Sequence, residues 1–303
     1  MKRWETATLT LLLEIYSHPI SYRDMRPRAF ADLSQQSDPN FFRKISEGLS
    51  HIAHNVSSID ADFRRLVEDN RGRGARILHA CAAEEAGKFL ILLDAVRCPR
   101  IPPVRFTAQL KKANSHLAKG LYAEANDIRH FDFSEVKLWI ERESAEFYLD
   151  GPNDVDWIFR NRIAHSRENT LYVDYVAAEG AHYWDIPGML DENISLLTPS
   201  RAAVEMVLAL EGAGFTNAPA LKVIADTWRP VPMRNDMDVR ELRRLNVLTL
   251  NELSRLNLLV KQQDNEYSMI ATNWFFPLYD LPIKSVKMAP ADLESERNKW
   301  SPE

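Results

Sequence analysis

The chain has 303 residues, of which 45% are hydrophobic and 27% charged, a composition typical of soluble globular proteins. Its formal net charge of −5 argues against a protein that coats nucleic acid indiscriminately, so any contact with RNA or DNA needs a local basic surface. Two cysteines are too few for a disulfide framework, the N-terminus is a poor signal peptide, and no apolar run approaches the roughly 18 residues of a membrane span, so we expect a soluble, cytoplasmic protein without membrane contact.

The first part of the chain predicts a short helix and a loop, followed by two long helices. Residues 1–39 combine the short helix with a loop rich in Pro, Ser, Asp and Arg. From about Phe41, apolar side chains recur every three or four positions as far as the glycines near residue 72, which predicts an amphipathic helix. The next segment, about 75–97, is apolar nearly all round and should be a helix at the centre of a bundle.

Three charged side chains, Glu84, Glu85 and Lys88, lie in the middle of this central helix. Burying a charge costs free energy unless the charge is paired, and Glu84 could pair with Lys88, four residues later. Gly87 costs a helix about 1 kcal/mol relative to Ala, which indicates close approach by another backbone or a ligand. A buried ion pair that only sets the register of the helix is an equally good interpretation.

A third helix is expected from about residue 105 to residue 127. One narrow sector of its helical wheel holds Arg105, Lys112, His116 and Lys119. Six Lys and Arg residues and no Asp or Glu occur between Arg97 and Lys119, which suits a phosphate-bearing partner. A solvated cationic face is the commoner explanation for such a run.

A fourth helix is expected around residues 136–147, and Asn153 is a plausible N-cap for a fifth. If the fifth helix continues to residue 168, Arg160, Asn161 and His165 share one sector of its wheel, and apolar residues occupy another. A guanidinium, an amide and an imidazole together can bind a phosphate, orient a nucleophile and move a proton. The pattern therefore indicates phosphodiester chemistry, although surface helices also carry such residues by chance.

The remaining segments predict a small β-hairpin and further helices. The hairpin is expected from residues 171–176 and 182–184, followed by a helix that opens at Thr198-Pro199 and ends at Gly212 or Gly214. Residues 213–303 are expected to form a separate α or α+β appendage of unknown role. It would contain a helix over 238–259, a short β-like segment around 267–270 and a polar tail. The expected fold class is mainly α, with a helical bundle over residues 40–212.

Three separated segments resemble motifs of one known family. Residues 81–88, Cys-Ala-Ala-Glu-Glu-Ala-Gly-Lys, are similar to the A-x-E-E-x-G-K helix of AbiV-type abortive-infection proteins, and residues 115–119 resemble their H-x-x-K element. Arg160-Asn161 through His165, with the residues that follow as far as Asp174, is similar to their closing motif. AbiV proteins belong to the HEPN superfamily of helical bundles, in which an R-x4-6-H motif marks metal-independent ribonucleases. The resemblance covers about residues 40–212.

The resemblance implies an endoribonuclease that leaves a cyclic phosphate and a 5′-hydroxyl and needs no metal or other cofactor. Arg160 would bind the scissile phosphate, Asn161 would orient the phosphate or the histidine, and His165 would act as general base or acid. Glu84 and Lys88 match motif positions and are expected to support the site. The expected RNA contacts are Lys112, His116, Lys119 and Arg167.

HEPN sites usually form where two protomers meet, so the resemblance implies a homodimer that acts on RNA in phage defence or as a toxin. An antitoxin, an inhibitor or a phage-encoded activator would then be a protein partner. Some HEPN proteins are catalytically inert, so a helical module that binds a partner protein, a nucleotide or RNA is the alternative. A metal enzyme is a weaker option, because His51 and His54 are three residues apart but no matching Glu-x-x-His pair occurs.

Overall fold

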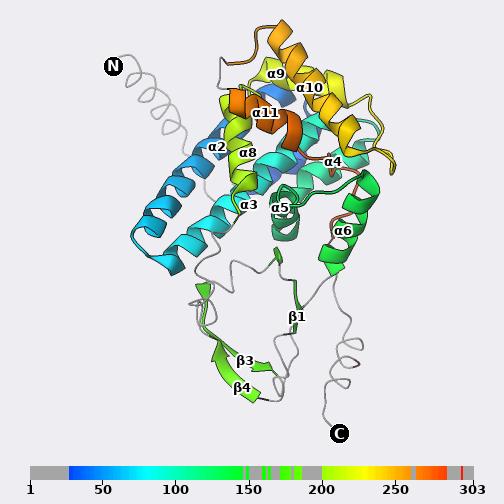
Figure 1. Ribbon diagram of the computed structural model, residues 1–303. Coiled ribbons are helices and arrows are strands. Elements are labelled where there is room, and N and C mark those ends of the chain that lie inside the picture. The colour runs from blue at the N-terminus through cyan, green and yellow to red at the C-terminus, as the bar shows by residue number, and fades with distance from the viewer. Residues whose placement is uncertain are drawn as a thin grey trace, which may run out of the picture.

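The computed structural model describes residues 27–145, 148–149, 159–161, 163–164, 171–178, 181–185, 200–260, 264–284 and 295. This part of the chain is mainly helical, as expected (Figure 1). Its elements are η2 (Ala29–Gln35), α2 (Asp38–Glu68), α3 (Gly72–Arg97), α4 (Pro103–Lys112), α5 (His116–Glu124), α6 (Phe133–Ala145), β1 (Tyr148–Leu149), β2 (Phe159–Arg160), β3 (Asp174–Ala178), β4 (Ala181–Asp185), α8 (Ala202–Gly212), α9 (Ala218–Trp228), α10 (Val239–Arg255) and α11 (Asp264–Asn273). None of the described helices is both long enough and apolar enough to cross a membrane.

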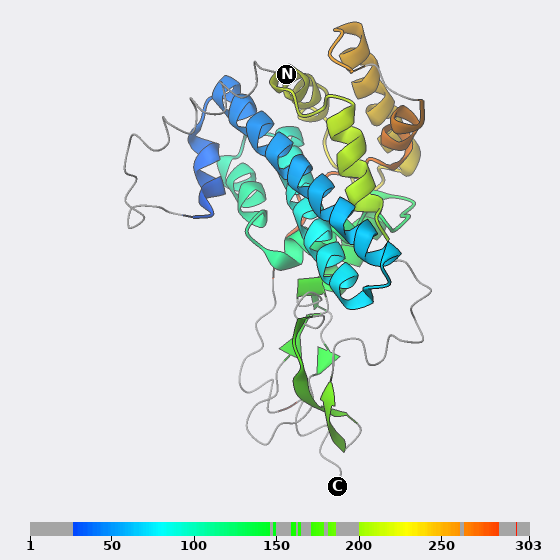
Figure 2. The same ribbon diagram turned by 90° about the vertical axis from the view of Figure 1, so that its left-hand side faces the viewer.

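The two longest helices, α2 and α3, pack side by side along much of their length (Figures 1 and 2). α2 buries one stripe at helical spacing, including Phe41, Ile45 and Leu49, and leaves its opposite face in solvent. The second half of α3 is buried on all sides, from Phe89 to Arg97. α8 and α9 also pack against both helices. The expectation that α3 lies at the centre of a bundle is confirmed.

The expected third helix is in fact two helices, and the prediction of one continuous helix is wrong. α4 ends at Lys112, and α5 begins at His116 after a short turn. The break is stabilised by Ser115, whose hydroxyl oxygen accepts a hydrogen bond from the backbone nitrogen of Ala118 at 3.2 Å and so caps α5. A helical wheel drawn across this break has no physical meaning, so the expected cationic sector is not one helix face.

The segment around Arg160 also differs from the expected helix. Phe159 and Arg160 form strand β2, which pairs antiparallel with β1 so that Arg160 lies opposite Tyr148. The chain becomes helical only at Ile163 and Ala164. Asn161 separates the two conformations, because its Oδ1 accepts hydrogen bonds from the amides of Ile163 and Ala164, at 3.0 and 3.2 Å. Arg160 therefore precedes the helical turn instead of lying on it, and His165 and Arg167 lie outside the described residues.

A second pair of antiparallel strands, β3 and β4, follows in the chain. Asp174 lies opposite Asp185 at one end of the pair, and Ala178 lies opposite Ala181 at the other. In both views these strands lie at the opposite end of the molecule from α9 and α10 (Figures 1 and 2). The two residues between the strands lie outside the described residues.

The C-terminal segments add α8 to α11 in succession. α8 ends at Gly212, one of the two positions expected, and α10 falls within the expected range 238–259. Asp238 caps α10 by accepting hydrogen bonds from the amides of Arg240 and Glu241, at 2.9 and 2.8 Å. The β-like segment expected around residues 267–270 is wrong, because these residues belong to α11. A short apolar run fits a strand and a buried helix equally well, and here its packing on α8 and α10 decides for the helix.

The hydrophobic core does not stop at residue 213, where a separate appendage was expected to begin. Trp228 and Trp274 contact each other edge to face, and both lie against the buried Arg97 of α3, whose guanidinium carbon is 4.8 Å and 4.4 Å from the two ring centroids. Arg97 also donates a hydrogen bond to the carbonyl oxygen of Phe275 at 3.0 Å, and the amide of Leu278 donates to Asp94 at 2.7 Å. The described residues after 213 therefore share one core with the bundle.

Candidate functional site

Gly87 brings α3 and α5 into direct backbone contact. A Cβ atom at this position would lie 2.0 Å from the carbonyl oxygen of Lys119, so only glycine allows the observed approach of the two helices. The close approach expected from a glycine in mid-helix is confirmed, and the neighbouring group is another backbone. The contact joins the first segment of the family-like pattern, residues 81–88, to the second, residues 115–119.

A carboxylate, an ammonium and an imidazole meet at this contact. Glu84 accepts a hydrogen bond from Lys119 Nζ at 2.6 Å, and His116 Nδ1 lies 2.9 Å from Glu84 Oε2. We call Glu84, His116 and Lys119 the polar cluster. The expected ion pair between Glu84 and Lys88 is wrong, because Lys88 pairs with Glu85. Glu84 instead points toward α5, where the absence of a side chain at Gly87 has brought both partners within reach.

The charge of Glu84 is stabilised in a partly buried setting. Its side chain is 17% exposed, Lys119 is 10% exposed and His116 is 39% exposed. Burial alone would raise the pKa of Glu84, but hydrogen bonds from Lys119 and His116, together with their charges, lower it below its ordinary value. Glu84 is therefore ionised at neutral pH, and it can hold the imidazole in one orientation.

The segment that contains Asn161 and Ile163 packs against α5 beside the polar cluster. A Cβ atom on Gly120 would lie 2.3 Å from Cγ2 of Ile163, so Ile163 fits where α5 has no side chain. His116 and Gly120 are four residues apart on α5 and therefore lie on one face. Asn161 is buried, and its Nδ2 donates a hydrogen bond to the carbonyl oxygen of Glu143 at 2.7 Å. The third segment of the family-like pattern is thus tied to α6 and lies one helical turn from His116.

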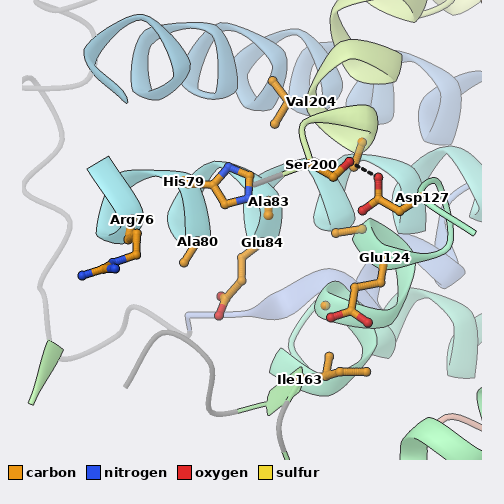
Figure 3. A pocket seen from close by; sticks show the side chains of 13 residues that line it. Arg76, His79, Ala80, Ala83, Glu84, Glu124, Asp127, Ile163, Ser200 and Val204 are labelled. Atoms are coloured by element: carbon orange, nitrogen blue, oxygen red, sulfur yellow. Dashed lines mark hydrogen bonds between the residues drawn. The ribbon is translucent and has the colours of Figure 1, made fainter. Parts of the chain in front are cut away.

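A pocket of about 320 Å³ opens between α3, the end of α5 and the start of α8 (Figure 3). Glu84 and Ile163, from the first and third family-like segments, line it together with Gly120, the residue that follows the second segment. Its other polar lining residues are Arg76, His79, Glu124, Asp127 and Ser200. The Ser200 hydroxyl donates to Asp127, and burial lowers the pKa of His79 despite the raising effect of the Asp127 carboxylate. The wall of the pocket is more apolar than polar, and its polar groups are the side chains of Arg76 and His79 and the carboxylates of Glu84, Glu124 and Asp127.

Arg76, His79, Glu124 and Asp127 line the pocket, and none of them was predicted to be a site residue. A signal was present on α3, because Arg76, Ala80, Ala83 and Glu84 recur at helical spacing on one face, with small residues between the two charged ones. Glu124 and Asp127 could not be placed without knowing that α5 packs against α3.

The expected RNA contacts have different surroundings. Lys112 is buried, and its Nζ donates to the carbonyl oxygens of Leu278 at 2.8 Å and Tyr279 at 3.3 Å, so it is not available to RNA and that expectation is wrong. Burial lowers its pKa to about 8. The ammonium of Lys119 is held by Glu84, whereas His116 reaches solvent.

The weaker metal-site option has no geometric support in the part of the chain that is described. His51 and His54 are exposed on α2. Among the described residues, no three His, Cys, Asp or Glu side chains converge as metal ligands would.

Comparisons of the chain with protein-family models, with curated proteins and with solved structures give no match.

Proposed function

We propose that this protein is a metal-independent endoribonuclease of the HEPN type, acting in phage defence or as a toxin, and that it cleaves RNA through attack by the ribose 2′-hydroxyl. The observation that supports the proposal best is the packing of Ile163 on Gly120, one helical turn from the polar cluster. Three segments that resemble one family's motifs are far apart in the chain, yet the first two are in contact in the fold, and the third packs on Gly120, directly after the second. Such convergence is expected of a site and is not required by the helical pattern of any single segment.

In this proposal Arg160 binds the scissile phosphate and stabilises the charge that develops on it. His165 transfers a proton to or from the reacting oxygens. Asn161 acts on the chain instead of the substrate, because both ends of its buried amide are engaged by the backbone. It sets the point at which the strand of Arg160 ends and the helical turn of Ile163 and Ala164 begins. A homodimer would bring two such sites together, as the family resemblance implies.

The test is cleavage of total RNA by the purified full-length chain in the presence of EDTA. We expect the wild type to produce fragments with cyclic phosphate ends, and we expect His165→Ala to lower the rate by roughly 10²–10⁴-fold. Arg160→Ala should also abolish cleavage. His54→Ala, which removes an exposed imidazole from α2, is the matched control and should cleave like the wild type. Unchanged cleavage by His165→Ala would refute the proposal.

The alternative is an inert HEPN module that binds a partner protein, a nucleotide or RNA. One feature favours it, since Glu84, His116 and Lys119 satisfy one another and could serve only to join α3 to α5. This alternative predicts that toxicity in cells or RNA binding survives both His165→Ala and Arg160→Ala. Loss of toxicity in these two variants, with an unchanged melting temperature, would count against it.

A further inference from the structure

A second pocket, of about 550 Å³, is formed by the loop that joins α5 to α6, the first turns of α10 and the end of α11. Its described lining residues lie outside the three family-like segments. A pocket of this volume is large enough for a small organic ligand. It is therefore a candidate binding site that is separate from the site described above.

Two arginines from different elements line this second pocket. Arg129 lies in the loop between α5 and α6, Arg243 lies in α10, and both side chains are exposed. Among the described residues neither guanidinium has a carboxylate partner, and Arg243 makes one long hydrogen bond, from Nε to the carbonyl oxygen of Thr272 at 3.4 Å. Asp127 is the one carboxylate among the described lining residues, and it accepts a hydrogen bond from the Ser200 hydroxyl. The wall thus carries more positive than negative charge, in a chain whose net charge is −5.

Phe131 adds an aromatic surface whose backbone is fixed. Its side chain lines the pocket and is 60% exposed. Its amide donates to Glu135 at 2.7 Å, and its carbonyl oxygen accepts from the amide of Val239 in α10 at 2.9 Å. These bonds join the loop to the start of α10, so the ring and the guanidinium of Arg243 are held at one pocket. The neighbouring His130 adds no charge at pH 7, because burial lowers the pKa of its imidazole.

The positive charge continues from the pocket along the exposed side of α10. Arg240 and Arg244 are exposed and four residues apart, and Arg243 lies beside both of them on the same side of the helix. Neither Arg240 nor Arg244 has an ion-pair partner among the described residues. Glu241, the carboxylate between them in sequence, pairs with Arg234 at 2.8 Å. Such a surface attracts phosphate groups beyond the pocket itself.

The combination of cations and an exposed ring selects one class of ligand. A guanidinium binds phosphate oxygens through paired N–H donors, and an aromatic ring stacks on a nucleobase. We propose that this pocket binds a nucleotide, with its phosphate held by Arg129 and Arg243 and its base stacked on Phe131. A free nucleoside phosphate and one unit of a nucleic-acid strand share this chemistry, and Arg240 and Arg244 would contact further phosphates of a strand. The inference does not rest on the ribonuclease function proposed above, because it uses none of the residues of that site.

The experiment measures the binding of AMP and of a short labelled DNA oligonucleotide to the full-length protein at one fixed salt concentration. DNA lacks the 2′-hydroxyl, so the proposed cleavage reaction cannot consume this probe. Arg129→Gln and Arg243→Gln should each weaken the binding of both probes by roughly tenfold or more, through loss of charged hydrogen bonds to phosphate. Arg43→Gln, which removes an exposed arginine from α2, is the matched control and should bind both probes like the wild type.

The contribution of the ring is measured separately. Phe131→Leu keeps an apolar side chain but removes the aromatic face, so it should weaken the binding of both probes by roughly 5- to 100-fold. Phe131→Trp retains an aromatic face and should bind about as tightly as the wild type. Because these side chains are exposed, the melting temperature of every variant should match that of the wild type.

The double variant Arg240→Gln/Arg244→Gln distinguishes the two sources of the nucleotide. Weaker binding of the oligonucleotide alone would identify a strand, and unchanged binding of both probes would identify a free nucleotide. Inorganic phosphate that displaces AMP as well as AMP displaces itself, with no effect of Phe131→Leu, would overturn the inference in favour of a simple anion site. Displacement of AMP by poly-glutamate at equal charge would overturn it in favour of an acidic protein partner. No binding of either probe by the wild type at millimolar concentration, or wild-type binding by Arg243→Gln, would also overturn it, whether or not the protein cleaves RNA.

Discussion

Lys112 carries an ammonium group into the interior at the end of α4. Its Nζ donates to the carbonyl oxygens of Leu278 and Tyr279, in the segment that follows α11. Burial disfavours the charged form and lowers the pKa to about 8, although the nearby Asp94 and Asp280 carboxylates act in the opposite direction. The side chain serves as a hydrogen-bond donor that fixes the C-terminal segment against the bundle.

This lysine should make the stability of the protein depend on pH. The unfolded chain keeps the Lys112 proton up to about pH 10.5, whereas the native state releases it near pH 8, so between these values the unfolded state binds more protons and stability rises with pH. We expect the free energy of unfolding of the wild type, minus that of Lys112→Met, to increase by about 3 kcal/mol over this interval. Urea unfolding at several pH values measures it, and a constant difference would contradict the assignment.

Single residues show what the sequence could and could not predict. The charge of Lys112 is plain in the sequence, but its partners are 166 and 167 residues away, and no local pattern indicates whether a lysine ends in solvent or under a distant segment. Glu84 was expected to pair with Lys88, four residues later, but it pairs with His116 and Lys119 of α5. Gly87 is the opposite case, because its cost within a helix already implied a close neighbour.

Among the elements, the long helices were predictable because an apolar stripe repeats over many turns. α2, α3 and α10 begin and end within a few residues of the expected positions. The bounds of the short elements were not predictable, because a single hydrogen bond or strand pairing determines where each one begins or ends. The hydroxyl of Ser115 separates α4 from α5, and the amide of Asn161 ends strand β2 and starts a helical turn. Both caps could have been suspected from residue type, but the period of the surrounding apolar residues pointed to continuous helices.

The contact between α3 and α5 depends on Gly87. Gly87→Ala should therefore destabilise the protein, whereas the same substitution at an open helical position should stabilise it. Gly87→Ala places a Cβ atom 2.0 Å from the carbonyl oxygen of Lys119 and must push the helices apart, so we expect a loss of roughly 1–3 kcal/mol of stability. Gly48→Ala in α2 is the matched control. Nothing lies within 4 Å of its added Cβ, so the better helix propensity of Ala should stabilise the protein by up to about 1 kcal/mol. Urea denaturation compares the two, and equal effects would contradict the close contact.

At the scale of the whole molecule, one hydrophobic core runs from α2 to the segment after α11. The prolines after residue 213 suggested a boundary, but a proline marks the end of an element and does not say where a core ends. Arg97 and Asp94 of α3 are buried, and their partners Trp228, Trp274 and Leu278 all come from the C-terminal part. The bundle is therefore incomplete without those residues, whatever the role of the candidate site.

A chain that ends at residue 212 should not fold into a cooperative domain. Truncation would leave Asp94 and Arg97 without their C-terminal partners and would expose the apolar faces that α9, α10 and α11 cover, a combination expected to yield a collapsed state that binds ANS. The full chain should instead unfold in one transition, seen together by far-UV circular dichroism and tryptophan fluorescence.

A substitution pair tests the same point in the intact protein. Trp274→Ala, at a side chain 1% exposed, should cost about 3–5 kcal/mol, whereas Leu138→Ala, at one 65% exposed, should stay within about 0.5 kcal/mol. A cooperative transition in the truncated chain, or a harmless Trp274→Ala, would show that the bundle has a core of its own.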